Sequence, residues 1–220
     1  MMDPMQSETP VAPASATSVP RGLSEDQISD EPMTQFARWM TDALASGMPE
    51  PTAMVLSTVT AEGRPRARTV LLKAHDQAGF TFYTNRTSRK GRELAANPSA
   101  CLVFPWHGIE RQVIVEGKVR ELSQAESELY FRSRPRGSQI GAWASRQSTV
   151  IGSRAVLDDR VAELQRRWPE PERVPMPDFW GGYLLRPDAV EFWQAGTFRL
   201  HDRLRYRRVD GGWAVDRLSP

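Results

Sequence analysis

The sequence predicts a mainly β protein with a few helices, built as a small antiparallel barrel. Short apolar runs recur along the chain and are separated by turn signals that contain Gly, Asp and Asn. Helical periodicity is confined to a few segments, and strands do not alternate with helices as they do in a parallel α/β fold. With 220 residues, the chain is long enough for one domain with a sizeable core.

The first 30 residues are rich in Pro, Ser, Ala and Thr and contain almost no large apolar residues. We therefore expect a disordered tail over residues 1–30 and a single domain over residues 31–220. A first helix is expected to begin at Glu31-Pro32, because proline is tolerated in a first helical turn. Apolar residues follow at helical spacing until Gly47, which ends the helix.

A run of strands follows this helix, with turn signals between consecutive strands. The expected strands are residues 53–59, 67–74, 80–84, 99–106 and 111–121. Ser88 is expected to cap a short helix that ends near Asn97-Pro98, which places Arg89 and Lys90 in its first turn.

Two helices are expected next, over residues 123–132 and 153–168, and the chain then returns to strands. These strands are residues 183–186, 189–194, 203–209 and 213–218, with a hairpin turn at residues 210–212.

Composition and charge limit the kinds of partner. The net charge of +2 hides an asymmetry, because the first 32 residues are acidic and the remainder is basic. A basic body suits an anionic ligand, whereas nucleic-acid binding is disfavoured because there is no Lys/Arg run or known binding module. The single Cys101 excludes an internal disulfide, and no Cys/His spacing indicates a metal site. No signal peptide or membrane-spanning stretch is recognisable, so we expect a cytoplasmic protein.

Cationic side chains flank two short strand-like segments, Arg68–Lys73 and Arg199–Arg203. Fixed positive charge at the rim of a sheet suits a phosphorylated small molecule. Neither common glycine-rich phosphate loop is present, so side chains are expected to bind the phosphate. In an extended segment, residues 199, 201 and 203 share one face, so Arg199, His201 and Arg203 can converge on one pocket.

Eight blocks of the chain resemble the pyridoxamine 5′-phosphate oxidase family, in the same order. The blocks are Arg68–Lys73, Phe82–Asn85, Ser88–Lys90, Phe104–Trp106, Glu110–Gln112, Ser133–Trp143, Phe179–Gly182 and Glu191–Trp193 with Arg199–Arg203. The resemblance runs from about Glu31 to Pro220. It implies an FMN-binding split barrel that works as a homodimer, with FMN at the subunit interface.

The resemblance also implies roles for individual residues. The FMN-binding positions are Arg68, Thr69, Val70, Leu71, Leu72, Lys73, Tyr83, Thr84, Arg89, Lys90, Gln112, Gln147, Ser148, Trp193 and Arg203. The substrate phosphate is expected to contact Lys73, Tyr130, Arg134 and Ser138. Arg199 and His201 match the catalytic pair beside the substrate's pyridine ring, where they act mainly by positioning. The implied reaction oxidises pyridoxamine or pyridoxine 5′-phosphate to pyridoxal 5′-phosphate by hydride transfer to FMN, which O2 reoxidises to give H2O2.

Two features depart from the family pattern. An Arg-x-x-Tyr motif expected upstream of the first helix is replaced by Ser-Ala-Thr-Ser at residues 15–18. Phe198 stands just before Arg199, where relatives usually carry a polar residue. Two alternatives therefore remain open: an oxidase of similar fold that acts on another aromatic substrate, as in phenazine biosynthesis, and a non-catalytic flavin- or pyridoxal-phosphate-binding protein. Taken singly, Tyr130, Trp193 and His201 could also be structural residues.

Overall fold

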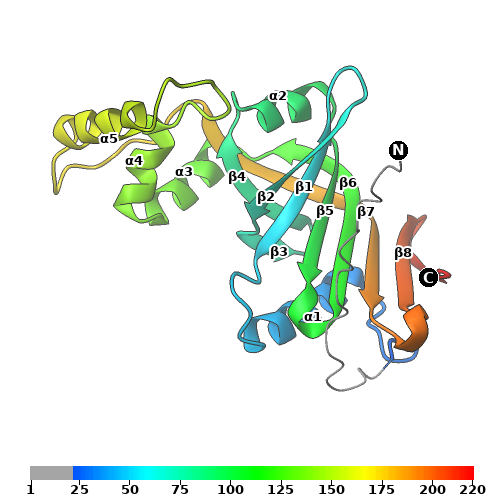
Figure 1. Cartoon of the computed structure of the whole chain (residues 1–220). Helices are drawn as coiled ribbons and strands as arrows, with labels where there is room; N and C mark the ends of the chain where they lie inside the picture. The colour runs from blue at the N-terminus through cyan, green and yellow to red at the C-terminus, as the bar shows by residue number, and fades with distance from the viewer. Residues whose placement is uncertain (1–21) are drawn as a thin grey trace, which may run out of the picture.

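One antiparallel sheet of nine strands forms the body of the protein (Figure 1). The computed structural model describes residues 22–220. Seven strands follow the order β2-β1-β5-β6-β7-β4-β3, and β8 and β9 extend the sheet from β7. The strands are β1 (Ala53–Val59), β2 (Pro65–Leu71), β3 (Ala74–Asp76), β4 (Gly79–Asn85), β5 (Ser99–Trp106), β6 (Arg111–Glu121), β7 (Trp180–Gln194), β8 (Asp202–Val209) and β9 (Gly212–Arg217). The predicted fold class, mainly β and antiparallel with helices, is confirmed.

The long strand β7 gives the sheet its curl. It pairs with β6 along one edge, while its other edge pairs first with β4 and then with β8. The sheet therefore branches at β7 and curls into an open half-barrel. Residues 183–186 and 189–194, predicted as two strands, belong to this one strand. Pro187 is tolerated inside it because it lies at a register shift opposite Gly117, where the ladder is already irregular.

Five α-helices accompany the sheet in the described part of the chain. They are α1 (Pro32–Ala45), α2 (Arg89–Ala96), α3 (Gln124–Ser133), α4 (Arg136–Ala144) and α5 (Ala155–Arg167). Helix α1 lies across one end of the sheet, and α3, α4 and α5 form a lobe beside the start of β7 (Figure 1). The Ser88 hydroxyl accepts a hydrogen bond from the Gly91 N–H, which confirms the predicted cap of α2.

Two local predictions are wrong. The sequence does not predict α4, because Gly137 and Gly141 weaken its helical signal. The predicted strand 67–74 is interrupted: β2 ends at Leu71, β3 begins at Ala74, and Lys73 lies in the connection.

An aromatic core holds α1 against the sheet. Phe36 is fully buried, and its ring lies 4.8 Å from that of Phe80 and 4.9 Å from that of Phe104 between centroids. A second apolar cluster, which includes Phe131, Ile140 and Trp180, lies beneath the α3–α5 lobe. This second cluster fixes the lobe to the start of β7.

Residues 22–30 contact the barrel, whereas the sequence places them in a disordered tail. Leu23 is buried in the main core, and its N–H donates to the Asp202 carboxylate at 3.0 Å. The Tyr206 hydroxyl donates to the Ser29 carbonyl at 2.6 Å. Arg217 also donates to the Leu23 carbonyl and to the Glu25 carboxylate. The sequence misjudges this segment because one buried leucine and these long-range bonds have no local signature. Residues 1–21, including the motif position 15–18, lie outside the described residues.

Among residues 22–220, no helix has the length and apolar character needed to cross a membrane.

Candidate functional site

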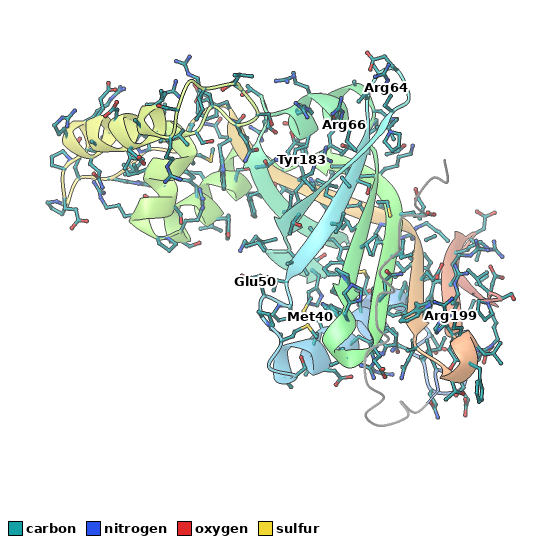
Figure 2. All side chains as sticks on the ribbon, in the orientation of Figure 1. Met40, Glu50, Arg64, Arg66, Tyr183 and Arg199 are labelled. Atoms are coloured by element: carbon teal, nitrogen blue, oxygen red, sulfur yellow. The ribbon has the colours of Figure 1, made fainter. Side chains whose placement is uncertain are left out.

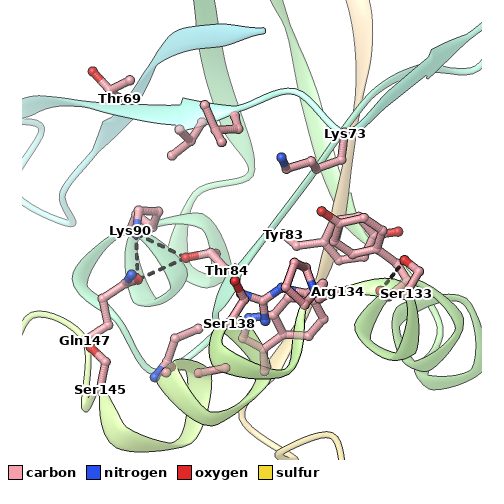
Figure 3. A pocket seen from close by; sticks show the side chains of 18 residues that line it. Thr69, Lys73, Tyr83, Thr84, Lys90, Ser133, Arg134, Ser138, Ser145 and Gln147 are labelled. Carbon is pink, nitrogen blue, oxygen red and sulfur yellow. Dashed lines mark hydrogen bonds between the residues drawn. The ribbon is translucent and has the colours of Figure 1, made fainter. Parts of the chain in front are cut away.

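A cavity of about 620 Å³ lies between strands β2 and β4, helices α3 and α4, and the start of β7 (Figure 3). It is lined by many of the residues that the sequence singles out. These are Thr69, Val70, Leu71, Lys73, Tyr83, Thr84, Lys90, Tyr130, Arg134, Ser138 and Gln147. These residues come from segments far apart in the sequence, and the fold brings them together around one cavity.

A lysine and two neutral oxygens define one side of this cavity. Lys90 Nζ donates to Gln147 Oε1 at 2.7 Å and to Thr84 Oγ1 at 3.1 Å (Figure 3). Burial, together with the neighbouring Arg68, lowers the pKa of Lys90 to about 8. Neutral partners do not cancel the charge of the ammonium group, so this side of the cavity suits an anion.

A second cationic region lies across the cavity. Lys73 and Arg134 approach it from opposite sides, and Ser138 adds a hydroxyl from α4 (Figure 3). Arg134 Nη1 is buried and has no hydrogen-bond partner in the described part of the chain. Burial also lowers the pKa of Arg134. An unpaired buried guanidinium nitrogen is costly, and an anionic ligand would satisfy it.

Three aromatic rings form a wall beside this region. The rings of Tyr83 and Tyr130 are stacked with centroids 4.0 Å apart, and the Trp180 ring is stacked 5.3 Å from that of Tyr83. Arg134 lies over the Trp180 ring, 4.9 Å from its centroid. A flat aromatic ligand with an anionic group fits a cavity that presents ring faces beside cations.

An adjoining cavity of about 510 Å³ opens on the other side of Lys90. It is lined by Arg66, Ala67, Arg68, Arg89, Lys90, Gln147 and Ser148. The Ser148 hydroxyl accepts a hydrogen bond from the Arg89 N–H at 3.2 Å, which joins the loop after α4 to the first turn of α2. Four cations line this one small cavity, and three of them, Arg68, Arg89 and Lys90, are among the predicted FMN-binding positions.

Apart from Leu72, the remaining predicted residues form a second group. Gln112, Trp193 and Arg203 face one another in register across β6, β7 and β8. The ring of His201 lies 4.7 Å from that of Trp193 between centroids. Arg203 is held by two hydrogen bonds to Glu191, at 2.8 and 3.1 Å.

The prediction of one extended segment over residues 199–203 is wrong, because Thr197–Arg199 form a 3-10 turn and β8 begins only at Asp202. A tight loop therefore presents Arg199 and His201, whereas Arg203 lies on the strand. Phe198 and Arg199 both have positive φ, 54° and 63°, which costs about 1–2 kcal/mol for each side-chain-bearing residue. The loop is closed by a hydrogen bond from the Gly196 N–H to His201 Nδ1 at 3.2 Å. A Cβ on Gly196 would lie 1.9 Å from the Leu200 carbonyl oxygen, so only glycine fits there. Phe198 is 93% exposed at the tip of this loop.

The two groups do not meet within one chain. Trp180 lines the large cavity at the start of β7, and Trp193 lies near the end of the same strand. A strand of 15 residues spans on the order of 45 Å at about 3.3 Å per residue. Leu72 joins neither group, because it is buried in the main core.

Sequence reasoning missed several residues that shape the cavities. Arg66 lines the smaller cavity, and Gly141, Ala142 and Ser145 line the larger one. The small residues at positions 138, 141, 142 and 145 follow helical spacing, a signal that could have revealed the inner face of α4. Arg66 lies two residues before Arg68 and therefore on the same face of a strand, which is also readable from the sequence.

Comparisons with known proteins agree with this geometry. A family model described as pyridoxamine 5′-phosphate oxidase matches residues 40–167. A second model, the pyridoxine 5′-phosphate oxidase C-terminal dimerisation region, matches residues 180–220. A pyridoxine/pyridoxamine 5′-phosphate oxidase of Frankia alni is 59% identical over 202 residues, which cover 90% of this chain and 84% of the relative. The protein of the same description from Acidothermus cellulolyticus is 52% identical over 215 residues, covering 96% of each chain.

Solved structures share the architecture. PhzG from Burkholderia lata 383, in complex with tetrahydrophenazine-1-carboxylic acid, superposes with a TM-score of 0.86 at 33% identity and covers 93% of this chain and 100% of its own. A pyridoxamine 5′-phosphate oxidase-related, FMN binding protein from Nostoc punctiforme has a TM-score of 0.68 at 16% identity, covering 84% of this chain and 97% of its own. These structures confirm the predicted split-barrel fold. With both family models and relatives of more than half identical sequence in agreement, the chain belongs to the pyridoxamine 5′-phosphate oxidase family.

Proposed function

We propose that this protein is an FMN-dependent oxidase that converts pyridoxamine or pyridoxine 5′-phosphate to pyridoxal 5′-phosphate, with O2 as acceptor and H2O2 as product. The observation that carries the proposal is the presence of two cationic regions around adjoining cavities, one at Arg68, Arg89 and Lys90 and the other at Lys73 and Arg134. Two separate anion sites suit a reaction in which both the cofactor and the substrate carry a phosphate.

The donor set fits FMN on the evidence of its own contacts. Within residues 22–220, the buried Lys90 ammonium donates only to neutral oxygens, so a phosphate would give it a directly bonded anionic partner. When bound, FMN supplies the two-electron oxidation, while the protein supplies orientation and electrostatics. Arg68, Arg89, Lys90 and Ser148 would hold its phosphate, with Thr84 and Gln147 placed by their bonds to Lys90.

Lys73, Arg134, Ser138 and Tyr130 would bind the substrate phosphate. The orphaned Nη1 of Arg134 gains a partner in that arrangement. Each charge-assisted contact stabilises the complex by about 1.5–3 kcal/mol, so losing one of them should weaken binding more than it slows the reaction. The stacked Tyr83, Tyr130 and Trp180 rings would exclude water from one side of the substrate.

Arg199 and His201 would act at the pyridine ring. His201 Nδ1 already accepts the Gly196 N–H, so in the neutral imidazole the proton resides on Nε2. Nε2 is then the atom that can contact the reacting oxygen or nitrogen of the substrate and hold a proton there. Arg199 lies in the same loop with positive φ and an exposed side chain, two positions before His201, so its guanidinium would be available to the substrate.

A homodimer completes this arrangement. Trp193 lies near the end of β7 that is remote from the cavity of its own chain. Beside it lie Gln112 on β6, Arg203 on β8, and Arg199 and His201 in the connection between β7 and β8. A second subunit would bring its copy of this group to the cavity, with FMN at the interface. The match of residues 180–220 to a dimerisation region supports this placement. The cytoplasmic location expected from the sequence remains a prediction.

The principal rival is oxidation of another aromatic substrate. PhzG superposes closely, and the exposed Phe198 gives the loop beside Arg199 an apolar tip. Identity favours the vitamin B6 substrate, because it is 52–59% to the pyridoxine/pyridoxamine 5′-phosphate oxidases reported above and 33% to PhzG.

The deciding experiment is a turnover assay of the purified, FMN-loaded protein with pyridoxine 5′-phosphate and pyridoxamine 5′-phosphate. We expect oxygen-dependent formation of pyridoxal 5′-phosphate with one H2O2 per product. A yellow dimer that forms no product from either compound would overturn the substrate assignment. The same preparation would then be tested with reduced phenazine carboxylic acids: turnover would establish the rival oxidase, and its absence would favour the non-catalytic binding protein.

A further inference from the structure

We propose that Arg66 is an additional ligand of the cofactor phosphate, beyond the residues that the family resemblance implies. The inference rests on the proposed function, because it takes the anion in the smaller cavity to be the phosphate of FMN. Arg66 lines that cavity together with Arg68, Arg89 and Lys90.

The strand geometry places Arg66 beside Arg68. The two residues are separated by one position in β2, so their side chains leave the same face of the strand. Their partners across the ladder in β1 are Thr58 and Leu56. Figure 2 shows Arg66 beside α2, and it shows Arg64 further out, at the tip of the β1–β2 hairpin.

Most of the Arg68 guanidinium is engaged inside the protein. Its Nη1 donates to the Thr58 hydroxyl at 2.6 Å and to the Leu56 carbonyl at 3.0 Å, and its Nη2 donates to Glu93 Oε2 at 2.9 Å. These bonds fix Arg68 rigidly, but they leave few of its donors for a ligand. A second guanidinium would supply the donors that Arg68 lacks.

Arg66 has those donors. Within residues 22–220, its one ion pair runs from Nε to Glu93 Oε1 at 3.4 Å, which leaves both terminal nitrogens available. Its side chain is 42% exposed, whereas that of Glu93 is 7% exposed. A guanidinium held at Nε keeps its terminal fork open for two parallel bonds to a phosphate.

The buried Glu93 carboxylate links the two arginines. Oε2 accepts from Arg68 and from the Thr58 hydroxyl, the latter at 2.5 Å, while Oε1 faces Arg66 and has no hydrogen-bond partner in the described chain. One carboxylate therefore orients two guanidiniums toward one cavity. The four cations that line the cavity exceed this single negative charge, so the site retains a positive field for a dianion.

The test compares FMN with riboflavin, which lacks the phosphate. Both affinities are measured by quenching of flavin fluorescence on titration with the apoprotein, for the wild type and for Arg66→Gln. We expect Arg66→Gln to weaken FMN binding about tenfold. The effect is smaller than for a buried charge-assisted contact, because solvent screens the half-exposed arginine. Riboflavin binding should be unchanged. Arg66→Lys should recover part of the loss, because it restores the charge without the fork.

Arg64→Gln is the matched control. It removes the same charge from an exposed arginine on the same hairpin, outside the cavity. FMN affinity equal to wild type in this variant, with a loss in Arg66→Gln, supports a direct phosphate contact.

Three results would overturn the inference: unchanged FMN affinity in Arg66→Gln, an equal loss for riboflavin, or an equal loss in Arg64→Gln. If the wild type itself binds no FMN, the proposed function fails together with the inference. If the wild type binds FMN and Arg66→Gln binds it equally well, the inference alone fails.

Discussion

The ammonium of Lys90 and the side-chain oxygen of Gln147 lie 2.7 Å apart, although 57 positions separate the two residues in the chain. The bond joins the first turn of α2 to the loop after α4, at the point where the two cavities adjoin. Any ligand that spans both cavities must contact this pair. The charge of Lys90 should therefore control how firmly such a ligand is held.

The affinity for FMN should fall as the pH rises through about 8. In the free protein the pKa of Lys90 is lowered to about 8, mainly by burial, so the side chain loses its charge above that pH. The phosphate of FMN keeps its full charge above about pH 7. We expect the dissociation constant to rise about tenfold between about pH 7.5 and 9.5, as one charge-assisted contact is lost. Fluorescence titration at each pH measures the dissociation constant. The Lys90→Met variant should bind FMN more weakly, and its dissociation constant should change little with pH. A wild-type profile as flat as that of the variant would remove Lys90 from the phosphate site.

Replacing Arg89 and Lys90 together by glutamine should release FMN. Two of the cations that line the smaller cavity disappear, so we expect affinity to fall at least about a hundredfold. The measurement is the flavin-to-protein ratio after gel filtration, read from the absorption spectrum. Arg92→Gln, which changes an exposed arginine of the same helix, is the control and should keep its flavin. Full occupancy in the double variant would contradict the assignment.

Arg199→Ala should lose most turnover while keeping FMN. Arg199 belongs to the second group of site residues and is not among the cations that line the cavity of its own chain, so cofactor affinity should stay within about twofold of wild type. We expect kcat to fall about a hundredfold, the order expected when a positioning group is removed. Steady-state kinetics with pyridoxine 5′-phosphate measures it. Arg186→Ala, an exposed arginine earlier on β7, serves as the control. Undiminished kcat would exclude Arg199 from the site.

Removing residues 1–30 should destabilise the protein, whereas removing residues 1–21 should not. The longer deletion takes away the buried Leu23, the Ser29 carbonyl that accepts from Tyr206, and the Glu25 carboxylate that pairs with Arg217 at 2.8 Å. Burial of one leucine side chain contributes about 1.5–3 kcal/mol, so we expect a loss of at least that size in the free energy of unfolding. Urea denaturation followed by tryptophan fluorescence measures it. Equal midpoints for the two truncations would show that residues 22–30 add nothing to the fold.

Local chemistry made much of the architecture predictable. Helix α1 follows from apolar residues at a period of 3.6, and the start of α2 follows from the serine that caps it. Prediction from neighbouring residues fails where an element is stabilised by contacts with residues distant in the sequence. Helix α4 carries two glycines, and it packs Ile140 into the cluster beneath the lobe. Pro187 sits inside β7 only because of an irregularity in β6 that its own neighbours do not encode.

The sequence by itself determined the chemistry of the site: cations, hydroxyls and amides in blocks that resemble one family. The tertiary structure decided how these side chains divide. It placed Lys73, Lys90 and Arg134 around one cavity, and it placed Trp193, His201 and Arg203 at the far end of β7. It also tied Arg68 to the buried Glu93 carboxylate, 25 positions away, and paired Arg66 with the same carboxylate through Nε alone. The physical reason is that strand register and long-range pairing are set cooperatively by the packing of the whole sheet, whereas capping and periodicity are set within a few residues.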